Sequence, residues 1–302
     1  MCISRICRLA ARACAVALAC CGPAHGQAQQ MRWAVYDLAP SYFVRGTPNL
    51  AALGEGIGDQ LLGMLVRSMP DYQHEVVLMN MPRVMAEMQA GKPICVVNAV
   101  RSPERAQLAY STPLIITPAP QLVLNTHLLE RHPDWKGGVS LAALTRDAEL
   151  RGQYQVGRSF GDKLDAILRA DANVGMKPNS GASAANALRM IGMGRADYTI
   201  EYPILVALRI REKEVSPDVV TVPIIDADAF VEGVVLCTRN AWGLDAMRRI
   251  DKELQLHAAT PEYQQALARW LSKQELSQHQ LDYERFYQRR ARTRYCSATS
   301  CP

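Results

Sequence analysis

Two arginines lie at the start of a predicted helix, in the segment Arg101-Ser-Pro-Glu-Arg105. Ser102 is a favoured helix N-cap, Pro103 suits the first helical position, and the helix dipole stabilises Glu104 there. Arg105 takes the third helical position, where the dipole opposes a positive charge. Backbone N–H groups at a helix start, together with a guanidinium, can bind a carboxylate or a phosphate. The segment therefore predicts either an anion site at Arg105, or a surface ion pair of Arg105 with Glu104 or another acid nearby.

The elements that must position this segment alternate between short apolar runs and longer stretches of helical period. That alternation is typical of an α/β fold and argues against a sandwich or a bundle. The chain is near the upper size limit of a single hydrophobic core, about 250–300 residues, which favours two lobes. We expect strands at 32–38, 75–79, 93–100, 121–125, 153–157, 196–200, 218–224 and 232–238, and helices at 56–69, 82–91, 162–170, 183–194, 203–213, 242–257 and 261–272.

The first 28 residues have the outline of a secretory signal peptide. Three arginines precede the short apolar run 13–21, and the small residues that follow suit cleavage after Gly26 or Ala28. The sequence Leu-Ala-Cys-Cys at 18–21 is an imperfect lipoprotein site, so a lipid anchor is the less favoured alternative. We therefore expect residues 1–28 to be removed on export.

Charge and hydropathy argue against two other classes of protein. Loss of the leader removes three arginines and no acidic residue, so the formal net charge falls from +5 to +2. A nearly neutral chain lacks the basic surplus of a nucleic-acid-binding protein. No later apolar run approaches the roughly 18 to 20 residues that cross a bilayer. We expect a soluble protein in a bacterial periplasm.

Four cysteines follow the leader, and an even number permits two disulfides in an oxidising compartment. Cys296 and Cys301 lie close together in a polar tail and could pair locally. Cys95 and Cys237 each lie in an apolar, strand-like run, so a disulfide and two buried free thiols are both open for them. Neither pair has a histidine at metal-ligand spacing, and we expect no metal site.

The helix start at Glu104-Arg105 resembles the signature of family 3 periplasmic solute-binding proteins, in which an aromatic-Ser pair and a proline follow. Here these residues are Tyr110-Ser111 and Pro113. The resemblance extends over essentially the whole chain after the leader, through individually weak motifs in a specific order. Further matching segments are 38–44, 54–62, 88–92, 194–203 and 263–271.

The resemblance implies a type II periplasmic-binding-protein fold. In this fold, two α/β lobes joined by two hinge strands close on a ligand in the cleft between them. Residues 31–122 and 230–302, with the C-terminal helices, would form lobe 1, and residues 123–229 would form lobe 2. In the amino-acid binders of the family, the arginine of the Glu-Arg pair holds the ligand carboxylate, which assigns that role to Arg105.

The family's second anchor is an aspartate that binds the ligand ammonium. It stands five residues after the aspartate of a Gly-Arg-x-Asp segment, and the same count from Asp197 lands on Tyr202, with Glu201 one position before it. Both residues are therefore candidates for the ligand site, and the departure argues against an ordinary α-amino acid ligand.

Further candidates come from the same comparison. Arg101 stands where the family usually has a small hydroxyl residue, and Arg158-Ser159 open a helix where Thr or Ser is common. Extra cations at two helix starts favour a more anionic ligand, unless these arginines are solvated or packed residues. The aromatic residues after the first strand could stack on a flat ligand or belong to the lobe core: Tyr36, Tyr42 and Phe43.

The leading hypothesis is an exported, monomeric binding protein that captures a small polar, carboxylate-bearing solute, anionic or zwitterionic, for an ABC importer or a sensor. We expect no catalytic residue, no cofactor and no nucleic-acid partner. Because a fold does not fix a function, the alternative is a dehydratase-like enzyme acting on a cyclic carboxylate, with Glu201 as general acid. A periplasmic sensory protein without transport is the third hypothesis.

Overall fold

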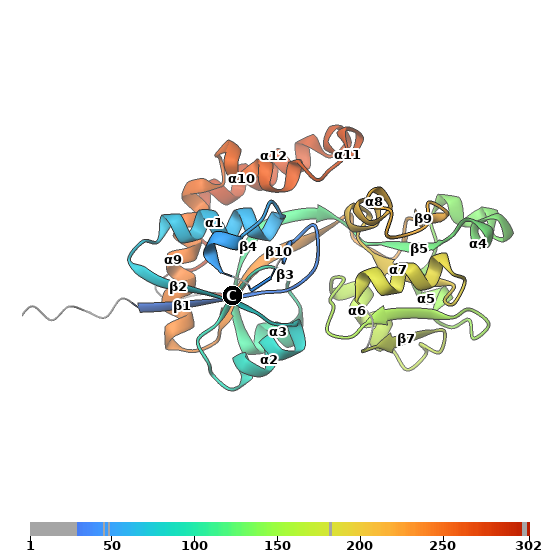
Figure 1. Cartoon of the computed structure of the whole chain (residues 1–302), viewed down its shortest axis with the longest axis horizontal. Helices are drawn as coiled ribbons and strands as arrows, with labels where there is room; N and C mark the ends of the chain where they lie inside the picture. Colours follow the sequence, from blue (N-terminus) through green and yellow to red (C-terminus); the bar gives the residue numbers. More distant parts are fainter. Residues whose placement is uncertain (1–28, 45, 48, 181–182, 298–300) are drawn as a thin grey trace, which may run out of the picture.

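The computed structural model describes residues 29–44, 46–47, 49–180, 183–297 and 301–302. The predicted signal peptide and the lipoprotein site lie outside these residues. Figure 1 shows two lobes side by side, each built on a five-stranded sheet. The strand order is β2-β1-β3-β10-β4 in the first sheet and β7-β6-β8-β5-β9 in the second. The predicted α/β class is confirmed.

The first sheet mixes parallel and antiparallel pairs. β1 runs parallel to β2 and β3, whereas β10 runs antiparallel to β3 and β4. The chain therefore leaves this sheet after β4 and returns to it in β10. The strands are β1 (Gln29–Val35), β2 (Tyr72–Leu78), β3 (Cys95–Val100), β4 (Ala109–Pro118) and β10 (Phe230–Thr238).

Helices cover both faces of the first sheet, because alternate strand residues point to opposite faces. In β1, Trp33 and Val35 belong to the core cluster under α1 and the C-terminal helices, whereas Ala34 belongs to the cluster under α2. The elements are η1 (Leu50–Ala52), α1 (Ile57–Ser68), α2 (Met81–Gln89), α3 (Pro103–Leu108), α9 (Ala241–His257), α10 (Pro261–Ala268), α11 (Lys273–Gln278) and α12 (Gln280–Arg292).

The second sheet has its own pair of core clusters. Leu122 and Leu124 pack with residues of α4, α5 and α6, and Val123 packs with residues of α7 and α8. β6 runs parallel to β7 and β8, and β5 runs antiparallel to β8 and β9. The elements are β5 (Gln121–Asn125), α4 (Thr126–Arg131), η2 (Pro133–Gly137), α5 (Leu141–Leu144), β6 (Gly152–Gln155), α6 (Asp162–Arg169), β7 (Met176–Asn179), α7 (Ala184–Gly192), β8 (Tyr198–Glu201), α8 (Pro203–Arg211) and β9 (Val219–Val222).

Two chain segments connect the lobes, from β4 to β5 and from β9 to β10. They lie side by side, since the backbone N–H of Ala119 donates to the carbonyl of Ala229 at 3.1 Å. The boundary expected after residue 122 falls inside β5, and the boundary expected after residue 229 falls at the start of β10. The exact residues at which the two lobes divide remain a prediction.

Two disulfides join the four described cysteines. Cys95 and Cys237 face each other in the pairing of β3 with β10, and they are bonded. Of the two alternatives that the sequence allowed for Cys95 and Cys237, a disulfide or two free thiols, the structure has the disulfide. Cys296 and Cys301 are bonded within the C-terminal tail.

A buried ion pair fixes the tail to the first sheet. Arg290 Nη2 lies 2.8 Å from Asp251 Oδ1, and both side chains are fully buried. The second oxygen of Asp251 accepts the backbone N–H groups of Tyr295 and Cys296. Arg290 also donates to the carbonyl of Pro113 in β4. The pair therefore couples α12, α9 and β4, which is one of the strands that lead to the other lobe.

Replacement of Arg290 by methionine leaves the Asp251 carboxylate buried without its cation. Such a loss costs about 3–5 kcal/mol, so we expect Arg290→Met to lower the free energy of unfolding by that amount in urea titrations. Arg285→Met on the exposed side of the same helix is the control and should stay within about 0.5 kcal/mol of wild type. Equal stability of the two variants would contradict this account.

Candidate functional site

A cavity of about 780 Å³ lies between the two lobes. This volume is in the range of small-molecule sites, about 300–1,000 Å³. Much of its lining comes from segments at or after the carboxyl ends of parallel strands, where open α/β sheets bind ligands. In the first lobe the segments are 36–41 after β1, 78–83 after β2, and 98–100 with Arg105 around the end of β3. In the second lobe they are 155–159 after β6 and residues 202, 204 and 205 after β8.

The lobes touch each other beside this cavity. Arg105 Nη2 donates to the carbonyl of Gly157 at 2.9 Å, and Glu104 forms an ion pair with Arg169 of α6 at 3.3 Å. Gly157 has a φ of +81°, and a Cβ there would lie 2.9 Å from Pro82 Cδ. Both the backbone conformation and the close approach of the lobes therefore require glycine at this position.

Arg105 is the central charged residue of the cavity. Ser102 caps the helix as predicted, accepting the N–H of Arg105 at 3.3 Å. The Arg105 side chain is 7% exposed, and it donates to the carbonyls of Val100 at 2.5 Å and Gly157 at 2.9 Å. Among the described residues no carboxylate forms an ion pair with it. The predicted alternative, a pair with Glu104, is not found, since Glu104 contacts Arg169.

Burial lowers the pKa of the Arg105 guanidinium, because desolvation disfavours the charged form. An arginine stays protonated even so. Two of its five N–H donors are used by the two carbonyls. The cavity thus contains a buried positive charge with free donor capacity.

Arg158, by contrast, is fully paired with an acid of its own lobe. Its Nη2 and Nη1 lie 2.6 Å and 3.1 Å from the two carboxylate oxygens of Glu201, and the side chains are 13% and 5% exposed. Burial lowers the pKa of Arg158, but the charge of Glu201, its hydrogen bonds and the neighbouring tyrosines together outweigh burial, so the pKa lies above its usual value. The guanidinium lies 5.4 Å and 6.0 Å from the ring centroids of Phe160 and Tyr202.

Ser159 also lines the cavity, at the start of α6. Its hydroxyl donates to Asp165 Oδ2 at 2.6 Å, and the backbone N–H of Phe160 donates to Asp165 Oδ1 at 2.8 Å. The Asp165 carboxylate attracts Arg105 through space, which raises the arginine pKa against the effect of burial. Asp165 is therefore committed to the helix start rather than to an ion pair with Arg105.

Two buried polar atoms in residues that line the cavity have no hydrogen-bond partner in the part of the chain that the structure describes. They are Tyr202 Oη and Gln155 Oε1. Buried polar groups nearly always have partners, and one left unsatisfied costs about 1–3 kcal/mol. Both atoms therefore suit polar groups of a bound molecule.

Asn98 shapes the opposite wall with an unusual backbone. Its φ of +59° lies in the left-handed region, and the register of β10 against β3 shifts at this level, between Val234 and Leu236. Its carbonyl accepts from Tyr36 Oη at 2.5 Å, and its side-chain amide donates to Ser41 Oγ at 2.8 Å. Backbone strain of this kind is concentrated at functional sites.

The other predicted site residues lie outside the cavity lining. Tyr42 is a core residue whose hydroxyl donates to the carbonyl of Val97, and Phe43 stacks on Trp270. Glu201 lies behind Arg158. Arg101 is exposed to solvent. Burial raises the pKa of Glu232, and the nearby charge of Arg101 partly offsets that rise. Of the aromatic candidates, Tyr36 and Tyr202 line the cavity.

The sequence reasoning missed Gln155 and Asn98. Gln155 is the last residue of β6 and Asn98 lies near the end of β3, so position at a strand end was the available signal. The left-handed φ of Asn98 leaves no comparable trace in the sequence, because it depends on the pairing with β10.

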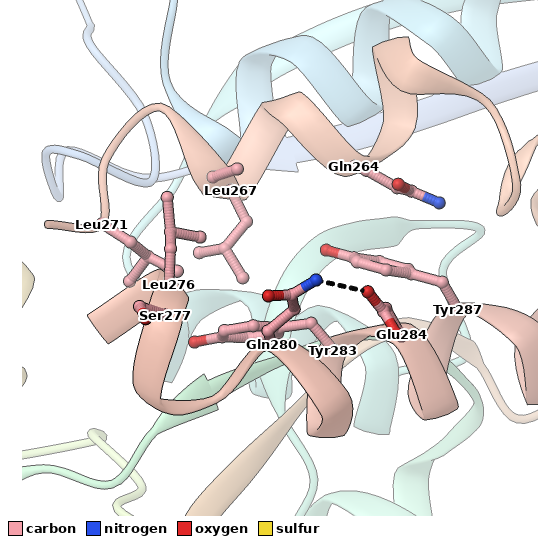
Figure 2. Close-up of a pocket in the computed structure, with 10 residues that line it drawn as sticks. Gln264, Leu267, Leu271, Leu276, Ser277, Gln280, Tyr283, Glu284 and Tyr287 are labelled. Carbon is pink, nitrogen blue, oxygen red and sulfur yellow. Dashed lines mark hydrogen bonds between the residues drawn. The ribbon is translucent and has the colours of Figure 1, made fainter. Parts of the chain in front are cut away.

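A second, smaller cavity of about 280 Å³ lies between α10 and the helices α11 and α12 (Figure 2). Its walls are mainly Leu267, Leu271, Leu276 and tyrosine rings, and Gln280 donates to Glu284 at 2.8 Å across its edge. No cation is among the described residues that line it, so it does not provide an anion site.

The described residues contain no group of ligands that could hold a metal ion, and no helix among them is long and apolar enough to cross a membrane.

No protein-family model matches this chain, and no curated protein matches it. Solved structures do match. A putative L-cystine ABC transporter protein from Listeria monocytogenes superposes with a TM-score of 0.60 at 17% identity, over 82% of this chain and 97% of that one. A histidine kinase sensor domain with similarity to periplasmic binding proteins gives 0.62 at 16%, over 81% and 96%. An ancestral amino acid-binding protein, a precursor of cyclohexadienyl dehydratase, gives 0.60 at 15%, over 81% and 96%.

At these identities the matches show the fold and nothing further. They confirm the two-lobe architecture that the resemblance implied. Other similar structures include amino-acid ABC transporter binding proteins, among them one from Streptococcus pneumoniae bound to L-arginine.

The left-handed backbone at Asn98 can be tested with a pair of variants. Asn98→Gly and Asn98→Ala both lose the hydrogen bond to Ser41, but only alanine meets the steric penalty of positive φ. We expect the glycine variant to be the more stable of the two, by roughly 1 kcal/mol in urea unfolding. An alanine variant as stable as the glycine variant would show that this conformation carries no strain.

Proposed function

We propose that this chain, which has the type II periplasmic-binding-protein fold of ABC-transporter substrate-binding proteins, captures a small polar, carboxylate-bearing solute between its lobes. It would act outside the cytoplasm, consistent with the predicted signal peptide, and deliver the solute to an ABC importer. The observation that carries the proposal is the Arg105 guanidinium, which is buried in the inter-lobe cavity and forms no ion pair with any acid in the described part of the chain.

The chemistry follows from the cost of a buried charge. A cation taken out of water is stabilised by an anion at hydrogen-bond distance, and the described residues offer Arg105 only backbone carbonyls as contacts. A guanidinium presents a planar fork that matches a carboxylate. A carboxylate from outside the chain would supply the missing negative charge, so this is the group we assign to the ligand.

The same contact would link ligand binding to lobe closure. Arg105 belongs to the first lobe and Gly157, Gln155 and Tyr202 belong to the second. A ligand that contacts both sets has more contacts in the closed arrangement than in an open one, so it stabilises closure. The apolar residues Ile57, Met79 and Leu205 in the lining would contact its uncharged part.

The enzymatic alternative required Glu201 as a general acid. Both of its oxygens accept hydrogen bonds from Arg158, and Oε1 also accepts the backbone N–H of Tyr202. A carboxylate whose two oxygens are held in this way is not available to act on a bound molecule. The binding role therefore has more support than a dehydratase-like role.

A sensory role is the second candidate. A histidine kinase sensor domain has the same two-lobe fold, with a TM-score of 0.62. Transport and sensing would use the same cleft, and the ligand contacts proposed here apply to both.

The proposal predicts stabilisation by a carboxylate ligand. In thermal-shift measurements over a panel of small carboxylates, at least one should raise the melting temperature of the wild-type protein, and a ligand at 100 times its Kd adds about 2.7 kcal/mol. Arg105→Met should weaken binding at least about 30-fold, because loss of one partner of a buried charge pair costs about 2–5 kcal/mol.

Arg83→Met is the matched control for that variant. Arg83 also lines the cavity but is exposed at its rim, so its removal should change affinity by less than about threefold. The proposal fails if no carboxylate stabilises the protein, or if Arg105→Met binds as tightly as wild type.

A further inference from the structure

We infer that Arg158 is a specificity-determining residue: by occupying Glu201 it makes the cleft select carboxylates that have no amino group beside the carboxylate, and reject α-amino acids. This inference rests on the proposed function and adds the class of ligand to it. Three features of the cavity support it: the pairing of Glu201, the remaining charges, and the uncharged polar groups.

The Glu201 carboxylate already has hydrogen-bond partners on both of its oxygens. Glu201 ends β8 directly before Tyr202 and lies outside the cavity lining, behind Arg158, which does line the cavity. The two nitrogens of Arg158 contact its two oxygens in the parallel, bidentate arrangement, which is the strongest form of this pair. The N–H of Tyr202 takes a further site on Oε1. A ligand ammonium would have to displace a buried guanidinium to reach this acid.

The second feature is the set of other charges near the cavity. Asp165 is bonded to Ser159 and to the N–H of Phe160, and it is not among the lining residues. Asp37 lines the cavity but is exposed to water. The buried charged groups of the described lining are therefore the guanidiniums of Arg105 and Arg158. An ammonium group brought into the buried part of this space would be desolvated beside two cations, and the one described lining carboxylate, Asp37, is out in the solvent.

The third feature is the pair of uncharged polar groups that are free to bind. Tyr202 Oη and Gln155 Oε1 are buried and without partners in the described structure. The amide oxygen accepts a hydrogen bond and the phenol can donate or accept one, so a ligand hydroxyl can pair with either. Hydroxy acids, which combine a carboxylate with a hydroxyl, match the cavity better than a zwitterion whose ammonium would lie beside two guanidiniums.

The inference is tested with pairs of ligands that differ only at the second carbon. Suitable pairs are phenyllactate with phenylalanine, 2-hydroxyisocaproate with leucine, and malate with aspartate, measured by calorimetry and thermal shift alongside the wider carboxylate panel. We expect wild type to bind hydroxy acids, or other carboxylates without an amino group, at least about 100-fold more tightly than any amino acid of the set. Arg158→Ser frees Glu201 and should improve binding of an amino acid at least about tenfold.

The control for the gain is Arg158→Ser/Glu201→Gln, which removes the freed carboxylate and should lose the new affinity for amino acids. If Arg158→Ser does not fold, the comparison of the matched ligand pairs on wild type decides the inference. Wild type that binds an amino acid as tightly as its matched hydroxy acid overturns the inference but leaves the proposed function standing. Absence of binding to every carboxylate overturns the proposed function itself.

Discussion

The cavity is organised around one buried cation, Arg105, with which no described carboxylate forms an ion pair. Arg105 donates to the carbonyl of Val100 in its own lobe and to the carbonyl of Gly157 in the other, so a single guanidinium contacts both halves of the molecule. Two neutral carbonyls do not balance its charge. A negatively charged ligand would balance this charge while preserving the contact between the lobes. Ligand affinity, lobe closure and the preference for an anionic ligand would then all depend on Arg105.

The fold places this residue where such a role is possible. Parallel strands in each sheet direct their carboxyl ends toward the cleft, so the loops after β1, β2 and β3 face those after β6 and β8. The ion pair of Arg290 with Asp251 holds the C-terminal helices against β4, whose end leads into the hinge. The second charged pair, Arg158 with Glu201, then decides which of the cavity's charges remain available.

Local patterns predicted most of the strands and helices and the helix start at Ser102, whereas the expectation that Arg105 faces the cleft came from the family resemblance. Contacts between distant segments could not be predicted in this way. Glu201 was assigned to the ligand or to catalysis because nothing in the sequence shows that Arg158 reaches it. Strand β4 was missed because Pro113 interrupts its pattern, and an edge strand tolerates proline. Tyr42 lies in the same loop as Tyr36, but its side chain is buried in the core. The sequence does not predict this orientation, because it depends on how the loop packs.

The most direct test is a crystal structure of the protein with the molecule that co-purifies with it or with the tightest carboxylate found. The account predicts a ligand carboxylate oxygen at about 2.7–2.9 Å from the Arg105 guanidinium, inside the inter-lobe cavity, with Arg158 still paired to Glu201. A ligand bound elsewhere, or one in the cavity that leaves Arg105 in contact with backbone carbonyls alone, would contradict it.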